Sequence, residues 1–96
     1  MGNFGCWKAI QNDEGFVTLE STDGRVMGSY KTRNDAFLKC AQAAMEQRYT
    51  LFALRDEGQC LGGFKGRSKY KKYGVSRHCK NGLGSHSSKS VYQIVG

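Results

Sequence analysis

The sequence lacks the features that mark membrane-spanning proteins, zinc modules and thiol redox enzymes. It contains no run of eighteen apolar residues, so an apolar transmembrane helix is not expected. Its four cysteines form no C-x-x-C pair, which argues against a zinc ribbon or knuckle and against a thioredoxin-like motif. No signal peptide is present, so we expect a secreted protein to be represented here by a mature or excised form.

Acidic residues are also missing from the last two fifths of the chain. Residues 1–57 carry seven Lys or Arg and eight Asp or Glu, whereas residues 58–96 carry eight Lys or Arg and no acid. The whole of the formal net charge of +7 therefore comes from the C-terminal part. Such asymmetry indicates an anionic partner, although basic surfaces also occur simply as solubilising charge.

What the chain does have is enough residues for one domain and enough cysteines to cross-link it. Ninety-six residues, 39% of them hydrophobic, suffice for one modest core, so residues 1–96 are expected to form a single domain. Small secreted domains with thin cores commonly add disulfides worth about 2–4 kcal/mol each. We therefore expect an extracellular protein with two disulfides. The alternative, four reduced cysteines in a cytosolic protein, stays open on the sequence alone.

The pattern of apolar residues predicts an α+β fold with an antiparallel sheet. Residues 49–54 are apolar almost without interruption, which is typical of a central strand covered on both faces. A turn at 55–58 then leads to a hairpin partner at 59–61. Residues 62–83 are expected to form a long loop with a short strand near 73–75. Further strands are expected at residues 4–10, 16–19 and 90–95.

One helix is expected over residues 34–48. Thr32 and Asp35 are spaced as in a capping box, with Asp in place of the usual Glu or Gln. Helical spacing predicts one apolar stripe and one polar face. The stripe consists of Ala36, Phe37, Cys40, Ala43 and Ala44, and the outward residues are Lys39, Gln42 and Glu46.

Four cysteines allow three pairings, and the sequence does not choose among them. Cys40 lies within the buried stripe of the helix, close enough for Cys60 in the hairpin to reach it. If the first strand and the C-terminal region are neighbours in the sheet, Cys6 pairs with Cys79. We favour this nested pattern.

Several short motifs resemble a cysteine-containing extracellular module repeated in many cnidarian and other marine invertebrate proteins. The resemblance spans nearly the whole chain, and the N-terminal two thirds is more distantly similar to WSC and PAN/apple domains. The motifs are Gly5-Cys-Trp-Lys8, Leu19-Glu-Ser-Thr-Asp-Gly24, Gly28-Ser-Tyr-Lys-Thr-Arg33, Lys39-Cys40, Leu51-Phe-Ala-Leu54, Gln59-Cys60, Tyr70-Lys-Lys-Tyr-Gly74, Cys79-Lys-Asn-Gly82 and Val91-Tyr-Gln-Ile94.

The resemblance implies a PAN/apple-like fold, in which a curved antiparallel sheet cradles one helix, and a secreted or ectodomain setting. It also implies binding of carbohydrate or protein, without catalysis. The chain departs from the module at Gln59, where relatives tend to carry Trp, and at Ser85-His-Ser-Ser-Lys89, where they tend to carry a Gly-Pro-Trp-like loop. Both changes remove aromatic rings on which a neutral sugar stacks, which weakens the case for a lectin of neutral sugars.

The clearest functional signal is the basic segment, residues 65–80, which holds seven cations and no acid. Arg binds a sulfate in a forked geometry and Lys as a point charge, and interleaved tyrosines can stack on sugar rings or bases. The alternative is a solvated loop whose tyrosines pack inward. The candidate ligand-binding residues are Lys65, Arg67, Lys69, Tyr70, Lys71, Lys72, Tyr73, Arg77 and Lys80.

Other classes of function fit the sequence less well. Nucleic acid would suit a basic, aromatic stretch, but no nucleic-acid-binding signature accompanies it. His78 and His86 lie in no recognisable nucleophile or metal arrangement, so neither an enzyme, a cofactor nor a bound metal is expected. We therefore expect a secreted recognition module for an anionic, sulfated or acidic glycan. The alternatives are a module for adhesion or matrix assembly that binds an acidic protein surface, and a lectin for neutral sugars.

Overall fold

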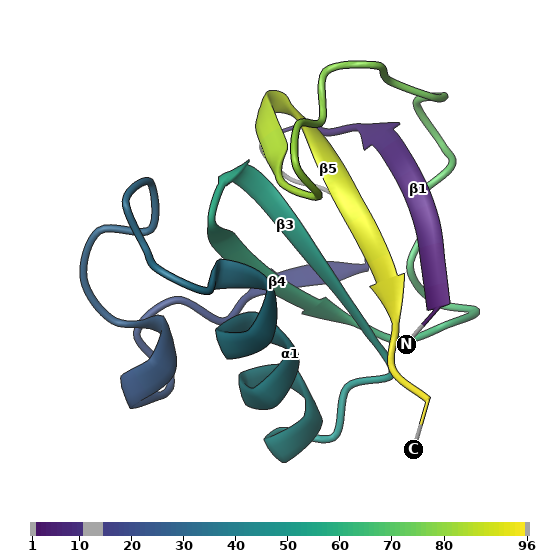
Figure 1. The fold of residues 1–96 in the computed structure, drawn as a ribbon. Coiled ribbons are helices and arrows are strands. Elements are labelled where there is room, and N and C mark those ends of the chain that lie inside the picture. Colours follow the sequence, from purple (N-terminus) through teal and green to yellow (C-terminus); the bar gives the residue numbers. More distant parts are fainter. Residues whose placement is uncertain (1, 11–14, 96) are drawn as a thin grey trace.

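The computed structural model describes residues 2–10 and 15–95, which form an α+β fold with one five-stranded antiparallel sheet and one α-helix. The sheet order is β1-β5-β3-β4-β2, and the helix lies against one of its faces (Figure 1). The elements are β1 (Gly2–Lys8), β2 (Phe16–Thr18), the short 3-10 turn η1 (Gly24–Val26), α1 (Ala36–Glu46), β3 (Leu51–Glu57), β4 (Gln59–Gly63) and β5 (Gly84–Gln93).

The central strand of the sheet is β3, as the apolar run predicts. It pairs with β4 on one side and with β5 on the other, and residues 51–54 are fully buried. The chain reverses at residues 56–58, inside the predicted turn, with Asp56 and Glu57 both at positive φ. Gly58 is required there because a Cβ atom would lie 2.3 Å from the carbonyl oxygen of Tyr30.

The helix is confirmed, but its predicted N-terminus is wrong. It begins at Ala36 rather than at Asn34, and Asp35 adopts a left-handed conformation with φ 52° and makes no side-chain capping hydrogen bond. The predicted capping box would place Asp35 in the first turn of the helix with right-handed backbone angles, so the box does not form. The predicted stripe is buried with Ala41 added, except that Phe37 is 39% exposed and packs edge-on against Phe52 and Tyr92.

Two disulfides tie the sheet to its surroundings, in the nested pattern favoured above. Cys40–Cys60 joins α1 to β4, and both residues are fully buried. Cys6–Cys79 joins β1 to the loop that precedes β5. One bond therefore lies inside the helix-side core, and the other fastens the end of the basic segment to an edge strand of the sheet.

The second face of the sheet carries a smaller core. Ala53, Leu61 and Val91 are buried there, and side chains from β1, β2 and the basic segment pack over them. Those covering side chains are Phe4, Trp7, Phe16 and Tyr70. The basic segment is thus part of the fold, because one of its tyrosines closes an apolar layer.

The last strand starts at Gly84, six residues before the predicted start at residue 90. The serines of this stretch give no apolar alternation, yet they bond to one another, with the Ser85 amide donating to Ser88 Oγ at 2.8 Å. Lys89 is fully buried, and its ammonium donates to the Lys8 carbonyl at 2.8 Å. The strand expected near 73–75 is reduced to a single bridge between Val75 and Trp7.

Candidate functional site

Two consecutive turns shape the first part of the basic segment. The amides of Arg67 and Ser68 both donate to the carbonyl of Phe64, directly after β4. The amide of Lys72 then donates to the carbonyl of Lys69, and that of Gly74 to Lys71. Local turns of this kind satisfy the backbone without a strand partner, so the lysine side chains project from a folded loop.

Tyr70 anchors this loop to the second face of the sheet. Its ring is stacked on Phe4 with centroids 5.6 Å apart and meets Trp7 edge-on at 5.4 Å. The indole Nε1 of Trp7 donates to the Phe4 carbonyl at 2.8 Å, which fixes the two β1 residues relative to each other. Aromatic pairs in these geometries add about 0.5–1.5 kcal/mol each beyond area burial. We call Phe4, Trp7 and Tyr70 the aromatic layer.

A β-bulge explains why Phe4 and Trp7 share a face of the sheet. Residues three apart in a regular strand point to opposite faces. The pairing of β1 with β5 shifts between Asn3 and Gly5, and Gly5 has φ +95°, a conformation that glycine adopts readily. The extra residue changes the alternation, so both aromatic side chains reach Tyr70.

Lysines lie directly over the aromatic layer. The Lys65 ammonium is 5.8 Å from the Phe4 ring centroid, and that of Lys71 is 5.8 Å from Trp7 and 5.7 Å from Tyr70. Exposed cation–π contacts are worth about 0.5–1 kcal/mol, enough to bias the position of a side chain while leaving its charge in solvent. Both lysines remain exposed. The aromatic layer thus holds cations in place on the outside of the fold.

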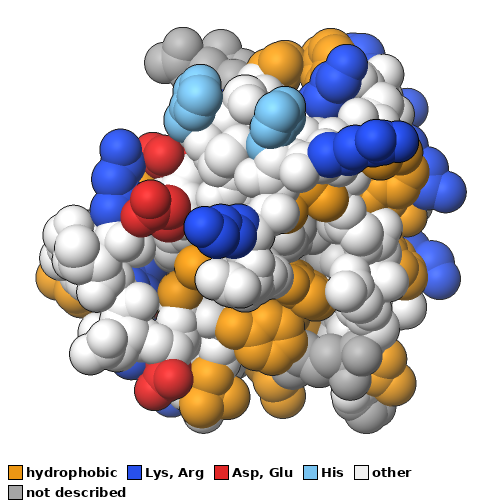
Figure 2. All heavy atoms as spheres, turned by 45° about the horizontal axis from the view of Figure 1, so that its top comes forward, with side chains coloured by type: hydrophobic (Ala, Val, Ile, Leu, Met, Phe, Trp, Pro, Cys, Tyr) orange, Lys and Arg blue, Asp and Glu red, His pale blue; other side chains and the backbone are white. Residues whose placement is uncertain are grey.

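Other cations of the segment group with these two only in part. Lys69, Lys71 and Lys72 line a shallow hollow of about 420 Å³ together with Ser68 and Tyr70. Arg67 instead lies over Phe64, at 5.6 Å. Lysines and arginines gather along one edge of the face drawn in Figure 2, beside hydrophobic side chains, and the acidic side chains in view lie on the opposite side.

The far end of the segment lies in a different setting. Lys80 lines a second hollow with Glu57 and His78, so an acid distant in sequence lies near this cation. Tyr73, with Lys72 over its ring at 5.5 Å, lines a third hollow with Lys8 and His78 rather than joining the aromatic layer. Arg77 is exposed. The structure therefore brings Lys65, Lys69, Tyr70, Lys71 and Lys72 together, and separates Lys80 and Tyr73 from that aromatic layer.

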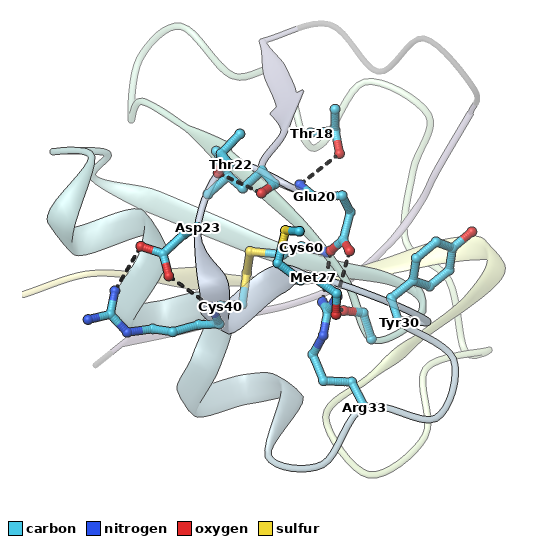
Figure 3. Close-up of polar contacts among 12 residues, drawn as sticks. Thr18, Glu20, Thr22, Asp23, Met27, Tyr30, Arg33, Cys40 and Cys60 are labelled. Atoms are coloured by element: carbon cyan, nitrogen blue, oxygen red, sulfur yellow. Dashed lines mark hydrogen bonds and ion pairs between the residues drawn. A yellow bond between two sulfur atoms is a disulfide. The ribbon is translucent and has the colours of Figure 1, made fainter.

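Several acidic residues on the helix side form ion pairs with cations outside the basic segment. Arg33 and Glu20 form a two-fold hydrogen-bonded pair at 2.6 and 2.8 Å, and Glu20 also accepts from the Cys60 amide at 2.7 Å (Figure 3). The hydrogen bond to Glu20 raises the pKa of Arg33 above its ordinary value. Further pairs join Arg25 to Asp23 and Glu46, and Lys31 to Asp56.

No acid in the described part of the chain forms an ion pair with the exposed cations of the basic segment that lie nearest the aromatic layer, Lys65, Lys69 and Lys71. Their fields therefore add in the solvent outside that layer. Within residues 2–10 and 15–95, no three His, Cys, Asp or Glu side chains are grouped so that they could hold a metal ion. Nor does that same part contain a helix long and apolar enough to cross a membrane.

Sequence reasoning missed three residues of this site. Phe4 and Trp7 were assigned to a strand, but their common face depends on the bulge at Gly5, and single glycines in strands do not specify which face follows. Ser68 was missed because a serine among lysines is typical of an exposed loop.

A scan against protein-family models and a search of curated proteins found no match to this chain.

Proposed function

We propose that the domain is a secreted recognition module that binds an anionic glycan through the basic segment. The observation that carries the proposal is the pair of lysines, Lys65 and Lys71, held at 5.7–5.8 Å over the aromatic layer. No described acid pairs with either of them. Cations beside aromatic rings offer both components that a sulfated sugar requires, charge for the sulfate and a flat apolar surface for the ring.

The rigidity of the surface supports this assignment. Lysines on a mobile loop lose side-chain entropy when they bind, whereas lysines already biased by an aromatic ring lose less. Tyr70 fixes the loop on the sheet, and Cys79 fixes its far end to Cys6. The hollow beside Tyr70 is shallow, which suits a chain of sugars lying along the surface better than a small molecule enclosed in a cavity.

The two disulfides support an extracellular setting, because such bonds form and persist in oxidising compartments. The resemblance to the invertebrate module and to PAN/apple and WSC domains fits the same setting. An antiparallel sheet that packs against a single helix is what that resemblance implies. We therefore place the domain in this extracellular group as part of the proposal.

Heparin affinity chromatography tests the proposal with two triple variants of equal charge. Lys69→Ala/Lys71→Ala/Lys72→Ala removes three cations beside Tyr70, and Lys31→Ala/Lys39→Ala/Arg48→Ala removes three cations from the helix side. We expect the wild type and the second variant to be retained beyond about 0.3 M NaCl, where exposed charges are well screened, and the first to elute much earlier. If both variants lose heparin retention equally, the retention depends on overall charge and not on the basic segment.

A comparison of sulfated with neutral glycans gives the complementary measurement. A glycan array on oxidised protein should show binding to sulfated chains that the first triple variant lacks. Binding to neutral sugars that survives in that variant would contradict the proposal and indicate a lectin site elsewhere on the domain. Retention of an acidic protein but of no glycan would likewise replace it with a protein-binding function.

A further inference from the structure

The hollow beside Tyr70 contains a buried polar group without a partner. Ser68 is only 9% exposed, and its Oγ makes no hydrogen bond, the one such buried side-chain atom found in the described part of the chain. Buried hydroxyls are nearly always hydrogen-bonded, because an unpartnered one retains the desolvation cost without compensation. An orphaned hydroxyl that lines a hollow together with three lysines therefore points to a ligand.

The backbone around Ser68 is fixed from two sides. Its amide donates to the Phe64 carbonyl at 2.9 Å, which closes the first turn of the segment. Gly15 packs against the opposite side so closely that a Cβ atom there would lie 2.4 Å from the Ser68 Cα. The Ser68 backbone therefore cannot shift without disturbing both contacts, and only rotation about the Cα–Cβ bond can re-aim its hydroxyl.

Three kinds of group meet at this hollow, all of them suited to one chemical class. Ser68 supplies a neutral donor, Lys69 and Lys71 supply ammonium donors, and Tyr70 supplies a ring. Donors on separate side chains can approach an oxyanion with three terminal oxygens from different directions, whereas the two oxygens of a carboxylate lie in one plane. The ring of Tyr70 offers its accessible surface to the group that carries the oxyanion.

We infer that the hollow lined by residues 68–72 is a subsite for a single sulfate ester on a sugar ring, with Ser68 Oγ donating to a sulfate oxygen that Lys69 and Lys71 neutralise. The inference rests on the proposed function and adds to it the position and type of the recognised anion. A phosphate ester on a sugar has the same shape, so it forms a separate arm of the test.

The experiment measures thermal unfolding and oligosaccharide affinity for Ser68→Ala. Removing an unpartnered buried hydroxyl should leave the Tm unchanged or raise it, and the lost hydrogen bond to a charged group should weaken binding of a sulfated heparin oligosaccharide about tenfold. Affinity for a hyaluronan oligosaccharide, which carries carboxylates and no sulfate, should not change. Ser68→Ala would then lose affinity without losing stability, which a structural role does not produce.

Ser88→Ala is the matched control. Ser88 is fully buried, and its hydroxyl accepts from the Ser85 amide at 2.8 Å, so its removal should lower the Tm. Because Ser88 does not line the hollow, the affinity for the sulfated oligosaccharide should stay at the wild-type value.

Each other outcome decides against the inference in a distinct way. If Ser68→Ala binds the sulfated oligosaccharide as the wild type does, while the triple lysine variant does not, the sulfate subsite is wrong and the proposed function stands. A fall in Tm for Ser68→Ala shows a structural partner and overturns the subsite. Tighter binding of a phosphorylated sugar than of its sulfated counterpart replaces sulfate with phosphate. If the wild type binds no anionic sugar, the proposed function fails as well.

Discussion

The two faces of the sheet use charge in opposite ways. On the helix side, cations lie opposite acids, and the Arg33 and Glu20 side chains are only 3% and 15% exposed. On the other side, Lys65 and Lys71 are exposed over aromatic rings, and no described acid forms an ion pair with either of them. Charge on the first side stabilises the fold, whereas the charges of Lys65 and Lys71 on the second side face solvent.

The difference shows that the number of lysines is a poor guide to a binding surface. Seven Lys or Arg residues precede position 58, nearly as many as follow it, yet several of the earlier ones are paired with acids of the same region. What distinguishes the later ones is the absence of acids and the presence of a rigid apolar support. Four changes test this contrast between the two sides.

The largest effect is expected from the disulfides. Loop closure alone assigns about 3 kcal/mol to Cys40–Cys60, which spans 20 residues, and about 4 kcal/mol to Cys6–Cys79, which spans 73. We expect the reverse order, because Cys40→Ala/Cys60→Ala also removes two fully buried sulfurs from the main core and should cost about 5 kcal/mol. Denaturant unfolding measures both double variants.

The outer bond should matter more for binding than for stability. Without it, residues 64–83 can loosen while the helix-side core stays folded. Cys6→Ala/Cys79→Ala should therefore lose heparin retention while keeping most of its helical circular dichroism signal. A greater loss of unfolding free energy in this variant than in the inner one would refute the division into two sides.

A smaller loss is expected when the buried ion pair is broken. Glu20→Gln leaves the Arg33 guanidinium buried without its counter-charge, which should lower the free energy of unfolding by about 2–3 kcal/mol. Glu46→Gln is the control, since it breaks an exposed pair with Arg25 and should have no measurable effect. Equal stability of the two variants would remove the distinction between structural and exposed charge. Heparin retention should be the same in both.

The contact between Gly15 and Ser68 is tested by two glycine substitutions. Both Gly15 and Gly66 have positive φ, so an alanine at either position is strained by about 1 kcal/mol. Only Gly15→Ala also forces a Cβ against backbone, so it should cost about 2 kcal/mol or more and weaken sulfated-glycan binding. Gly66→Ala, with open space around its Cβ, should bind normally. Chemical denaturation and affinity are measured on the same preparations.

The smallest effect concerns a tyrosine that joins the two sides. Tyr92 packs in the helix-side core and donates from its hydroxyl to the Gly82 carbonyl at 2.7 Å. Burial raises the pKa of Tyr92, so the folded state holds this proton more tightly than the unfolded state, and stability should fall as pH rises above about 10. Tyr92→Phe should lose about 1 kcal/mol at neutral pH and show a shallower alkaline decline. An unchanged alkaline decline would assign it to other groups.

The elements that sequence predicts well are those whose burial is continuous or periodic. The apolar run at residues 51–54 and the alanine-rich stripe of the helix are each recognisable from the local sequence pattern. The start of β5 shows no such pattern, because residues 85–88 are mostly serines. The Ser85 amide there donates to the hydroxyl of Ser88. The capping box was not predictable either, because residue spacing does not reveal that Asp35 adopts a left-handed conformation.

The charges of the candidate site were predictable from the sequence, but the aromatic layer beneath them was not. Lysines at 65, 69 and 71 are visible in the sequence as a cluster, whereas the contact of Tyr70 with Phe4 joins residues far apart in the chain. The alternative of an inward tyrosine proves to describe Tyr70, while the lysines around it stay exposed. The segment thus combines an inward tyrosine with exposed lysines.

The bulge at Gly5 sets a criterion for finding other chains with the same surface. Two residues separate Phe4 from Trp7, so in a regular strand the two rings would lie on opposite faces of the sheet, and the bulge brings them to one face. A homologue that keeps the lysines and this spacing but has a regular first strand would have no ring beneath its Lys65 counterpart. A glycine at position 5, which adopts positive φ readily, is therefore a better character to compare across such chains than basic composition.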